Sequence, residues 1–330
     1  MRELIRLGLV GSSFITDWML EAVRQTGNVK AAALYSREKA HGADYAQANG
    51  IPAVFDDYDE MLGFDGIDAV YLASPNYAHY DQAMAALEAG KHVLCEKPLA
   101  LNRAQGEAML AFARRKGLVC MEAIRPVHDP FLEVIRENLP RIGRVRRATF
   151  EFCQYSSRYE KYKAGEHVNI FDASLGNAAL LDLGVYCLHT CVALFGMPEK
   201  IFSGASTLDN GTEVAGTTLL DYGFMQAAVS YSKVTASAFP SLIQGEAGTL
   251  AFDTLNGPSY VHLYHLDKSR EELPYAPEKN NMVYELADFA RCVGGEGSME
   301  PYAAQSMTVL GIMDEIRRQE HIDFGPLEAL

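Results

Sequence analysis

Residues 93–98 read Val-Leu-Cys-Glu-Lys-Pro and place a lysine directly after a short apolar run. Pro98 has no backbone N–H for a sheet and disfavours helical geometry before it, so a strand here must end at Lys97. In a parallel α/β sheet, side chains at the carboxyl ends of strands face the ligand crevice. A lysine partly removed from water there has a lowered pKa and can exchange a proton near neutral pH. We interpret Lys97 as an acid/base candidate, the alternative being an exposed strand-end lysine.

A second group of polar residues recurs at helical spacing. Asp182, Tyr186 and His189 stand at i, i+4 and i+7 in an otherwise apolar segment, so one helix face would carry all three. Polar groups in such a segment need hydrogen-bonding partners or water. We interpret them as a row that faces a substrate, with Asp182 orienting hydroxyl groups and Tyr186 sharing a proton with Lys97. A purely structural hydrogen-bond cluster is the alternative.

Strands and helices alternate regularly through the first 122 residues, which predicts a doubly wound parallel sheet. Six apolar runs are expected as strands: residues 4–10, 29–35, 53–55, 67–73, 92–95 and 118–122. Segments between them carry apolar stripes at helical spacing and end at glycines: residues 14–26, 38–49, 80–89 and 103–116, with a short helix at 58–62. We therefore expect an NAD(P)-binding Rossmann domain over residues 1–122.

The turn after the first strand occupies the position of a dinucleotide-binding fingerprint but keeps only its first glycine, Gly11. Ser12 and Ser13 follow and can cap the next helix, whose N-terminal N–H groups would hold phosphates. The expected cofactor-binding residues at the carboxyl ends of the strands are Gly11, Ser12, Ser13, Phe14, Ile15, Ser74, Asn76, His79, Glu96 and Lys97. A capped turn without any ligand is the alternative for the glycine loop.

Ser36 and Arg37 end the second strand, where NAD-binding sites usually carry an acidic residue for the ribose 2′-hydroxyl. A hydroxyl and a guanidinium suit a 2′-phosphate instead, and Arg37 can also stack on adenine. We therefore expect NADP(H) to be favoured, with NAD(H) possible.

The composition limits the class of protein. The chain has 330 residues, 29 of them Lys or Arg and 43 Asp or Glu, for a net charge of −14, which argues against nucleic acid or an anionic membrane as partner. We find no apolar run of 18 residues and no basic leader, and expect a cytoplasmic protein without a membrane span. The cysteines lack Cys-x-x-Cys spacing and are expected as reduced thiols without a metal: Cys95, Cys120, Cys153, Cys187, Cys191 and Cys292.

The second half alternates apolar and polar residues, which predicts a large, mainly antiparallel open sheet. Strands are expected at residues 145–155, 201–207, 214–222, 225–234, 242–244, 249–252 and 259–265, and closing helices at 283–292 and 303–318. The polar loop between Ser156 and Ser174 reads as a lid or as a simple surface loop. The second sheet face is a candidate dimer surface, a solvated face being the alternative.

These residues resemble the Gfo/Idh/MocA oxidoreductases, which include glucose-fructose oxidoreductase, inositol dehydrogenase and dimeric dihydrodiol dehydrogenase. The resemblance covers the whole chain and rests on five stretches, at residues 8–15, 74–79, 90–98, 121–123 and 181–189. It implies a nicotinamide-dependent enzyme acting on a sugar, polyol or related alcohol or carbonyl. It also implies that Lys97 lies between nicotinamide and substrate, and that Asp182 and Tyr186 complete the catalytic group.

The resemblance leaves alternatives open. Dihydrodiol dehydrogenase-like members carry an aromatic residue after Met-Glu-Ala-Ile, where this chain has Arg125, so a hydroxyl-rich or anionic substrate is favoured. Arg125 joins Lys97, Asp182, Tyr186 and His189 as expected substrate-binding residues. A dihydrodiol or xylose dehydrogenase-like activity and a non-catalytic NADP-responsive regulator are the other interpretations. Residues 123–330 are expected to form a substrate-binding α+β domain that assembles a homodimer or homotetramer.

Overall fold

The computed structural model describes residues 4–322 and divides into two compact units. The first contains the chain up to Ile124 together with residues 279–307, and the second contains residues 125–278 and the chain from Thr308 onward. The prediction assigned all of residues 123–330 to one domain. The structure differs because α10 (Met282–Val293) buries its apolar face in the first core. An apolar stripe along a helix predicts that this face is buried, but it does not identify the sheet against which the helix packs.

The first unit is built on a six-stranded parallel sheet in the order β3-β2-β1-β4-β5-β6, which confirms the predicted class. Its strands are β1 (Ile5–Val10), β2 (Val29–Tyr35), β3 (Ala53–Phe55), β4 (Ala69–Leu72), β5 (His92–Glu96) and β6 (Cys120–Ala123). The strand order reverses between β1 and β4, and ligands of such sheets bind outside the strand ends at this reversal. The turns after β1, β4 and β5 therefore begin where a ligand crevice is expected.

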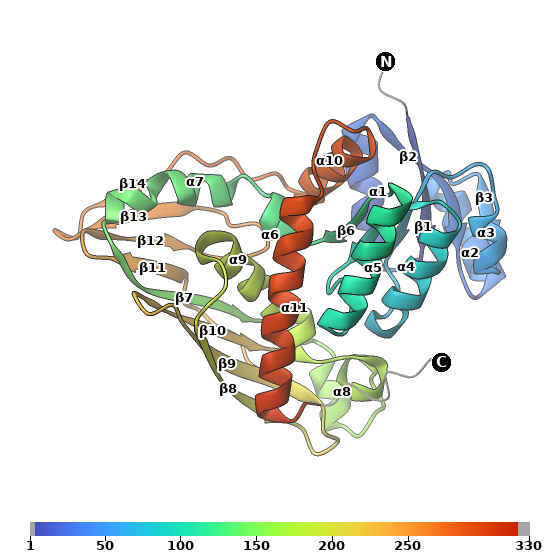
Figure 1. Ribbon diagram of the computed structural model, residues 1–330. Coiled ribbons are helices and arrows are strands. Elements are labelled where there is room, and N and C mark those ends of the chain that lie inside the picture. Colours follow the sequence, from blue (N-terminus) through green and yellow to red (C-terminus); the bar gives the residue numbers. More distant parts are fainter. Residues whose placement is uncertain (1–3, 323–330) are drawn as a thin grey trace. The chain divides into compact units, whose positions relative to one another are not determined.

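Helices cover both faces of this sheet (Figure 1). One face packs Leu7, Leu9 and Tyr71 against apolar residues of α1 (Phe14–Thr26) and α10, among them Met19 and Phe289, all of them buried. The remaining helices of the unit are α2 (Lys39–Asn49), α3 (Tyr58–Leu62), α4 (His79–Glu88) and α5 (Arg103–Lys116), of which α4 and α5 lie side by side. A sheet buried on both faces explains why its strands read as continuous apolar runs.

The second unit contains an eight-stranded sheet in the order β14-β13-β12-β11-β7-β10-β9-β8. All neighbouring pairs are antiparallel except β7 with β10, so the predicted mainly antiparallel sheet is confirmed. The strands are β7 (Val145–Cys153), β8 (Lys200–Thr207), β9 (Glu213–Asp221), β10 (Gln226–Ser232), β11 (Ser241–Gly245), β12 (Gly248–Phe252), β13 (Val261–His265) and β14 (Arg270–Glu272). The prediction missed β14 because its three residues, Arg-Glu-Glu, carry no apolar pattern.

One face of this sheet forms the core of the second unit. Ala148, Ala227, Ile243 and Leu250 point to it and are fully buried. The helices of the unit are α6 (Arg125–His128), α7 (Phe131–Asn138), α8 (Tyr159–Lys163), α9 (Val185–Phe195) and the later part of α11 (Glu300–Glu320). Among these, α9 contacts both β7 and β10. The strands therefore bury one side chain in two, as the alternating sequence predicted.

The apolar segment Ala173–Phe195 bears on the expectation that the chain has no apolar run of 18 residues. By length and composition it is apolar enough to cross a membrane, so the statement that no run of 18 residues qualifies was wrong. In the structure 78% of its most apolar window is buried, and the segment contains Asp182. A core helix of a compact unit has the same composition, because it is buried on nearly every side.

Candidate functional site

The turn after β1 shows why its single glycine is required. Gly11 has a φ of 101°, and a Cβ there would lie 2.9 Å from the carbonyl oxygen of Ala73. Ser13 occupies the N-cap position of α1, and its carbonyl accepts the N–H groups of Thr16 and Asp17. Thr16 is buried and donates its hydroxyl to the carbonyl of Gly11 at 3.1 Å, which ties the turn to the helix. The N-terminal N–H groups of α1 follow directly, and such groups at the start of a helix are suited to an anion.

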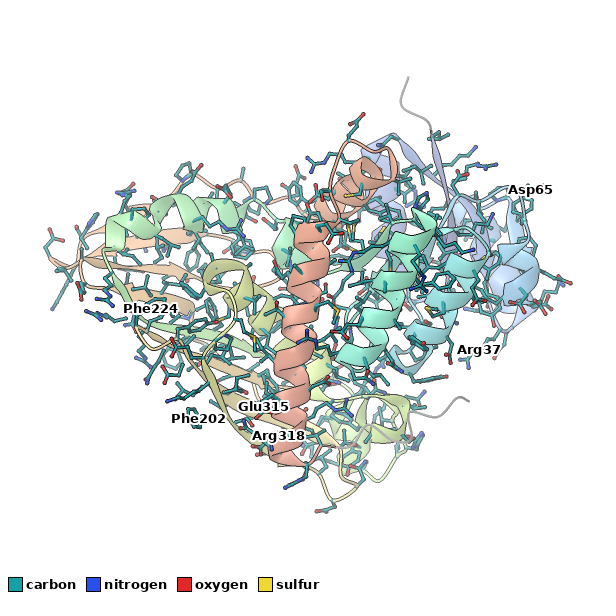
Figure 2. All side chains as sticks on the ribbon, in the orientation of Figure 1. Arg37, Asp65, Phe202, Phe224, Glu315 and Arg318 are labelled. Atoms are coloured by element: carbon teal, nitrogen blue, oxygen red, sulfur yellow. The ribbon has the colours of Figure 1, made fainter. Side chains whose placement is uncertain are left out.

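The turn after β2 carries the polar pair expected there. Ser36 is buried and donates its hydroxyl to the carbonyl of Glu38, whereas Arg37 is exposed (Figure 2). Lys39 is already paired, 2.9 Å from Asp56. The sequence interpretation missed His41, whose Nε2 lies 3.1 Å from the Ser12 hydroxyl. This contact links the turn after β1 to the first turn of α2, and the position of His41 just behind Ser36-Arg37 was the available signal.

The turn after β5 fixes the backbone around Lys97, which is half-buried. Glu96 is buried; its carboxylate accepts the Tyr71 hydroxyl at 2.5 Å and the Lys97 N–H at 3.3 Å. The peptide bond between Lys97 and Pro98 is cis. Glu122 of β6 accepts the N–H of Leu99 at 2.9 Å. Two buried carboxylates therefore hold the turn, one on each side of the lysine.

His79, at the start of α4, was predicted among the cofactor-binding residues. Its side chain is fully buried. Its Nδ1 lies 2.8 Å from the carbonyl of Pro98, and its Nε2 lies 3.0 Å from the carbonyl of Ser74. Burial lowers the pKa of His79, although both carbonyls act in the opposite direction. The imidazole thus links the turns after β4 and β5, while Asn76 begins the short helix beside them.

In the second unit, Asp182 lies in a π-helical segment, Leu180–Gly184, that runs directly into α9. The prediction assumed a regular α-helix here. A π-turn inserts one residue and is frequent at functional sites, and sequence periodicity alone does not reveal it. The Asp182 side chain is 37% exposed, and its Oδ2 lies 3.2 Å from the ammonium of Lys233. Lys233 follows β10 and was not singled out from the sequence.

Tyr186 and Arg125 form a contact pair within the second unit. The Arg125 guanidinium lies 3.5 Å from the Tyr186 hydroxyl and stands over the ring, 5.8 Å from its centre. Phe152 packs edge-on against the same ring. Tyr186 and His189 are both buried, His189 more completely. Of the three residues in the predicted row, Asp182 is therefore partly exposed, whereas Tyr186 and His189 are buried.

Glu213 on β9 is a further buried acid that the sequence interpretation missed. Only 1% of it is exposed, and it accepts the N–H of Leu180 at 2.9 Å. Burial raises its pKa from 4.5 to about 7, although the N–H groups of Leu180 and Ala179 and the charge of Lys233 act in the opposite direction. The sequence carries no clear signal for it, because Glu213 directly precedes the strand that was expected at residues 214–222.

The cysteine side chains are unpaired with one another and mostly buried. All six are free thiols, and burial raises the pKa of Cys95 and Cys187 well above the usual value. A thiol held protonated in this way is a poor nucleophile and a poor metal ligand. Within residues 4–322 no three His, Cys, Asp or Glu side chains are grouped so as to hold a metal ion.

The donor groups of the first unit fit a nicotinamide dinucleotide. A glycine turn leads into a 13-residue helix, as pyrophosphate binding requires. The exposed Arg37 beside Ser36 suits a phosphate on the adenosine ribose. The fold and these turns define a protein that binds NAD(P) on a Rossmann unit and carries a separate α+β unit.

Comparisons with known proteins agree with that class. Residues 5–124 match the oxidoreductase family with an NAD-binding Rossmann fold, and residues 135–251 match the GFO/IDH/MocA C-terminal domain. A scyllo-inositol 2-dehydrogenase (NADP(+)), IolU of Bacillus subtilis (strain 168), is 36% identical over 99% of this chain and 100% of its own. The chain belongs to the Gfo/Idh/MocA oxidoreductase family.

Two further relatives show the breadth of that family. A trans-1,2-dihydrobenzene-1,2-diol dehydrogenase from Oryctolagus cuniculus is 28% identical over 97% of this chain and 98% of its own. The structure of KijD10, a 3-ketoreductase from Actinomadura kijaniata in complex with NADP and TDP-benzene, superposes with a TM-score of 0.84. It is 25% identical and covers 96% of this chain and 98% of its own. The protein is therefore an NAD(P)-dependent oxidoreductase by family.

Proposed function

We propose that the protein is an NADP(H)-preferring dehydrogenase or reductase that acts on the CH–OH or carbonyl group of a sugar, polyol or related alcohol. The observation that carries this proposal is Lys97, a half-buried lysine at the end of β5 in a turn held by Glu96 and Glu122. A lysine in such a turn is suited to proton exchange with a substrate oxygen. The activities named for the inositol and dihydrodiol relatives support the same reaction type.

In this proposal Gly11, Ser12, Ser13 and the start of α1 hold the pyrophosphate, and Arg37 with Ser36 holds the 2′-phosphate. When bound, NADP(H) supplies or accepts the hydride. The donors Phe14 and Ile15 contribute N–H groups of the first helical turn, and Ser74 and Asn76 line the turn after β4. Glu96 and His79 act on the backbone around Lys97, as their contacts indicate.

The proton step is assigned to Lys97 and Tyr186. Lys97 donates a proton to the carbonyl oxygen during reduction and takes it back during oxidation, and Tyr186 can share it. Asp182 accepts hydrogen bonds from substrate hydroxyls, and Arg125 beside Tyr186 favours a hydroxyl-rich or anionic substrate. His189 is retained as a substrate-row residue that acts from a buried position.

The preference for NADP(H) rests on Arg37. Its exposed guanidinium stands where an acidic residue would repel a 2′-phosphate. The name of the inositol relative includes NADP(+), and the 3-ketoreductase structure is a complex with NADP, which supports the same choice. A dihydrodiol dehydrogenase-like activity is the second candidate, favoured by the similarity over nearly the whole length of that relative.

We also propose that the chain assembles into a homodimer or homotetramer through the open face of its second sheet and works in the cytoplasm. That face carries a cross-strand row of Phe202, Leu219, Ala228, Thr149 and Leu242, each paired with the next. Phe202 is 55% exposed, and apolar side chains in such a row are typical of a face that another chain covers. Six free thiols fit a reducing compartment.

The test begins with purified wild-type protein screened against pooled inositols, sugars, polyols and diols for NADP+ reduction at 340 nm. A compound that is oxidised then serves to compare the wild type with Lys97→Met. Removing a general acid/base group typically costs about 10² to 10⁴ in rate. We expect such a fall in kcat, with the affinity for NADPH, measured by fluorescence titration, within about threefold of the wild type.

Two results would contradict the proposal in different ways. A Lys97→Met protein that keeps most of its kcat would remove the proton role from Lys97. A wild-type protein that binds NADPH but oxidises nothing in the screen would favour the NADP-responsive regulator. Tyr186→Phe is the companion variant, since a shared proton step predicts a smaller loss and a shifted pH profile.

A further inference from the structure

The side chain of Lys233 is buried to an unusual degree for a lysine. Only 3% of the side chain is exposed, although the residue lies directly after the last residue of β10. Placing an ammonium group away from water is costly unless opposite charge and hydrogen bonds compensate. A chain that needed only an apolar filler at this position would carry Met or Leu. The charge at Lys233 therefore requires an explanation.

Three groups of the second unit surround that ammonium. Asp182 Oδ2 lies 3.2 Å from Nζ, and the carbonyl oxygen of Ile170 lies 3.5 Å from it. Glu213 contributes through its charge, because Lys233 lowers its pKa. The backbone of Lys233 is fixed as well, since its N–H donates to Val214 and its carbonyl accepts from Ser156. The ammonium thus projects from a hydrogen-bonded strand end toward Asp182.

The Lys233 and Asp182 side chains differ in their exposure to solvent. This difference distinguishes a positioning role for Lys233 from a purely stabilising one. Asp182 is 37% exposed at its side chain, whereas Lys233 is 3% exposed. The ammonium therefore lies behind the carboxylate, on the interior side. A surface ion pair would be exposed at both partners, and a fully internal one would be buried at both.

Glu213 supports the same segment from its N-terminal side. Its Oε2 accepts the N–H of Leu180 at 2.9 Å, the first residue of the π-helical segment that carries Asp182. The N-terminal N–H groups of a helical segment lack intrahelical acceptors, so this carboxyl group takes the place of a capping residue. Glu213 fixes where the segment begins, and Lys233 fixes the side chain of Asp182, two residues later.

We propose that Lys233 is a positioning residue of the active site, whose buried ammonium holds the Asp182 carboxylate ionised and oriented so that it can accept hydrogen bonds from substrate hydroxyl groups. This inference rests on the proposed function, because it assigns Lys233 an effect that operates through Asp182. Lys233 itself does not contact substrate. Its second contact, with the carbonyl of Ile170, ties the polar loop of residues 156–174 to the same ammonium.

The ionic form of Asp182 is set by the groups around it. Lys233 favours the carboxylate, because its ammonium lies 3.2 Å from Oδ2. Arg125 of α6 contacts Tyr186, one turn further along the same helical run. Glu213 of β9 is the acidic neighbour, and α9 itself carries the titratable groups Tyr186, Cys187, His189 and Cys191. When Lys233 is removed, a cation in contact with Asp182 is lost. Protonation of Asp182 then occurs at higher pH.

The experiment compares four proteins on the compound identified by the NADP+ screen: wild type, Lys233→Met, Asp182→Asn and the double variant. We expect Lys233→Met to lower kcat/KM roughly 10- to 100-fold, the range typical of residues that orient an active-site ligand. The acid limb of the kcat/KM profile should move to higher pH, and NADPH affinity should stay within about twofold. Lys200→Met, at an exposed position on β8, is the matched control and should match the wild type.

The double variant decides between positioning and an independent role. If Lys233 acts through Asp182, the double variant has the same kcat/KM as Asp182→Asn within about threefold, since interacting sites are not additive. Losses that multiply would overturn the inference, as would a folded Lys233→Met protein with wild-type kcat/KM and an unmoved acid limb. The double variant buries no unpaired charge, whereas Asp182→Asn leaves the buried Lys233 ammonium without that carboxylate, so the double variant is also compared directly with Lys233→Met and with the wild type.

Failure of the proposed function has a different signature. A wild-type protein that binds no NADPH and converts no compound would refute the function and, with it, the assignment of Lys233. A wild type that is active while Lys233→Met behaves like Lys200→Met would refute the assignment of Lys233 alone. Thermal unfolding of each variant shows that the compared proteins are folded.

Discussion

At the residue scale, buried charges decide how the turns around the candidate site are held. Glu96, Glu122 and Glu213 each accept a backbone N–H from a turn or helix start. Such bonds involve a charged or chargeable acceptor and are stronger than those between neutral groups. These three acids hold the backbone, whereas proton transfer is assigned to Lys97 and Tyr186. Removal of one of the acids should therefore lower the stability of the fold first and the activity only as a consequence.

Arg37 is expected to decide the choice of cofactor. Arg37→Asp should weaken NADPH binding by roughly 10- to 100-fold, since it replaces a charge-assisted bond with repulsion. It should also bring the NADH affinity closer to that for NADPH, as shown by fluorescence titration of both. Lys39→Met is the matched control, because this neighbouring cation is already paired with Asp56 and should change either affinity by less than about threefold. An unchanged NADPH affinity in Arg37→Asp would refute the assignment.

Glu213 should make stability depend on pH near neutrality. Its pKa is raised from 4.5 to about 7 in the folded protein by burial, so its contribution to stability is complete below pH 4.5 and is lost as the pH rises through 7. Shifts of this size correspond to about 1 to 3 kcal/mol at most. Glu213→Gln cannot ionise and should therefore show a smaller decline in stability between pH 5 and 8. Urea unfolding at several pH values measures this, and equal pH slopes would contradict it.

At the element scale, the helical run that carries Asp182 and Tyr186 is positioned by close packing. Gly184 lies between them, and a Cβ there would meet the ring of Tyr231 on β10 at 2.8 Å. Tyr231 is itself buried. The glycine in the Asp-x-Gly-x-Tyr sequence therefore lets the helix approach the sheet closely. This packing fixes how far Asp182 and Tyr186 lie from the sheet.

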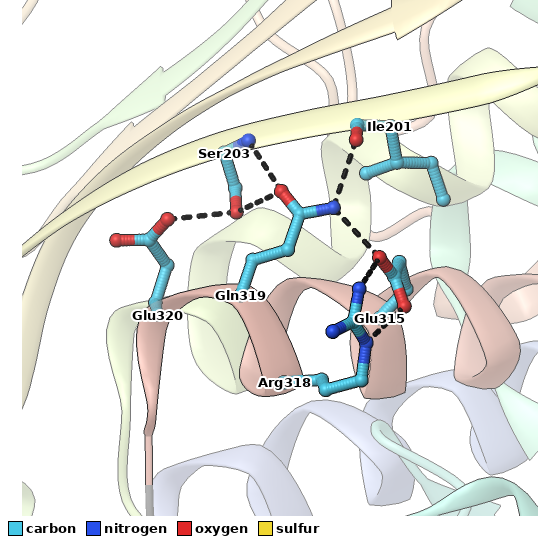
Figure 3. A network of polar contacts seen from close by, with 6 residues as sticks. All are labelled: Ile201, Ser203, Glu315, Arg318, Gln319 and Glu320. Carbon is cyan, nitrogen blue, oxygen red and sulfur yellow. Dashed lines mark hydrogen bonds and ion pairs between the residues drawn. The ribbon is translucent and has the colours of Figure 1, made fainter.

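The edge strand β8 is protected by the end of α11 (Figure 3). The Gln319 side chain donates to the carbonyl of Ile201 at 2.8 Å and accepts the N–H of Ser203 at 3.0 Å. Glu320 accepts the N–H of Ala205 at 2.9 Å. These alternate residues direct their backbone groups away from β9, where a further strand would otherwise pair. The helix therefore occupies the positions at which another chain could extend the sheet.

We expect the double variant Gln319→Ala, Glu320→Ala to aggregate more readily and to unfold at a lower temperature than the wild type. Each lost side-chain bond to a backbone group should cost about 0.5 to 1.5 kcal/mol. Arg318→Ala is the control, since it removes a surface ion pair with Glu315 and leaves the strand contacts intact. Light scattering during a thermal ramp measures both effects. Equal scattering by the double variant and the control would show that these side chains do not protect the edge.

At the scale of the whole molecule, the exposed face of β8 is open to another chain, whereas its edge is occupied by the end of α11. Phe202 and Phe224 are both about half exposed and are labelled in Figure 2. Phe202 pairs across the strands with Leu219, and Leu219 with Ala228. An oligomer formed by this chain should therefore use the sheet face and not the β8 edge.

Leu219→Arg should convert the proposed oligomer to a monomer. An arginine within this row would place an unpaired charge in the interface, which typically costs several kcal/mol. Size-exclusion chromatography with light scattering gives the mass directly, and 36.3 kDa is the mass of one chain. Thr254→Arg, at an exposed loop position away from this row, is the control. A wild type that is already monomeric would refute the proposal.

Much of the fold could be predicted from the sequence because its signals are local. Apolar runs, helical stripes and glycine stops depend on residues close together in the chain, so the six strands of the first sheet and most of the second were predicted. The same holds for the end of β5 at Lys97, where Pro98 imposes the stop. β14 and the π-helical segment were missed because a three-residue polar strand and a one-residue insertion leave no periodic signal.

The sequence by itself determined the two-part class of the protein, the strand ends that carry Gly11, Ser36 and Lys97, and the spacing of Asp182 and Tyr186. Only the tertiary structure decided which buried groups hold them. Lys233 meets Asp182 across 51 residues of chain, and α10 packs in the first core although it follows the second sheet in the sequence. Such partners depend on the register and packing of distant elements, and a buried charge is compensated by whatever residue the fold brings within a few ångströms of it.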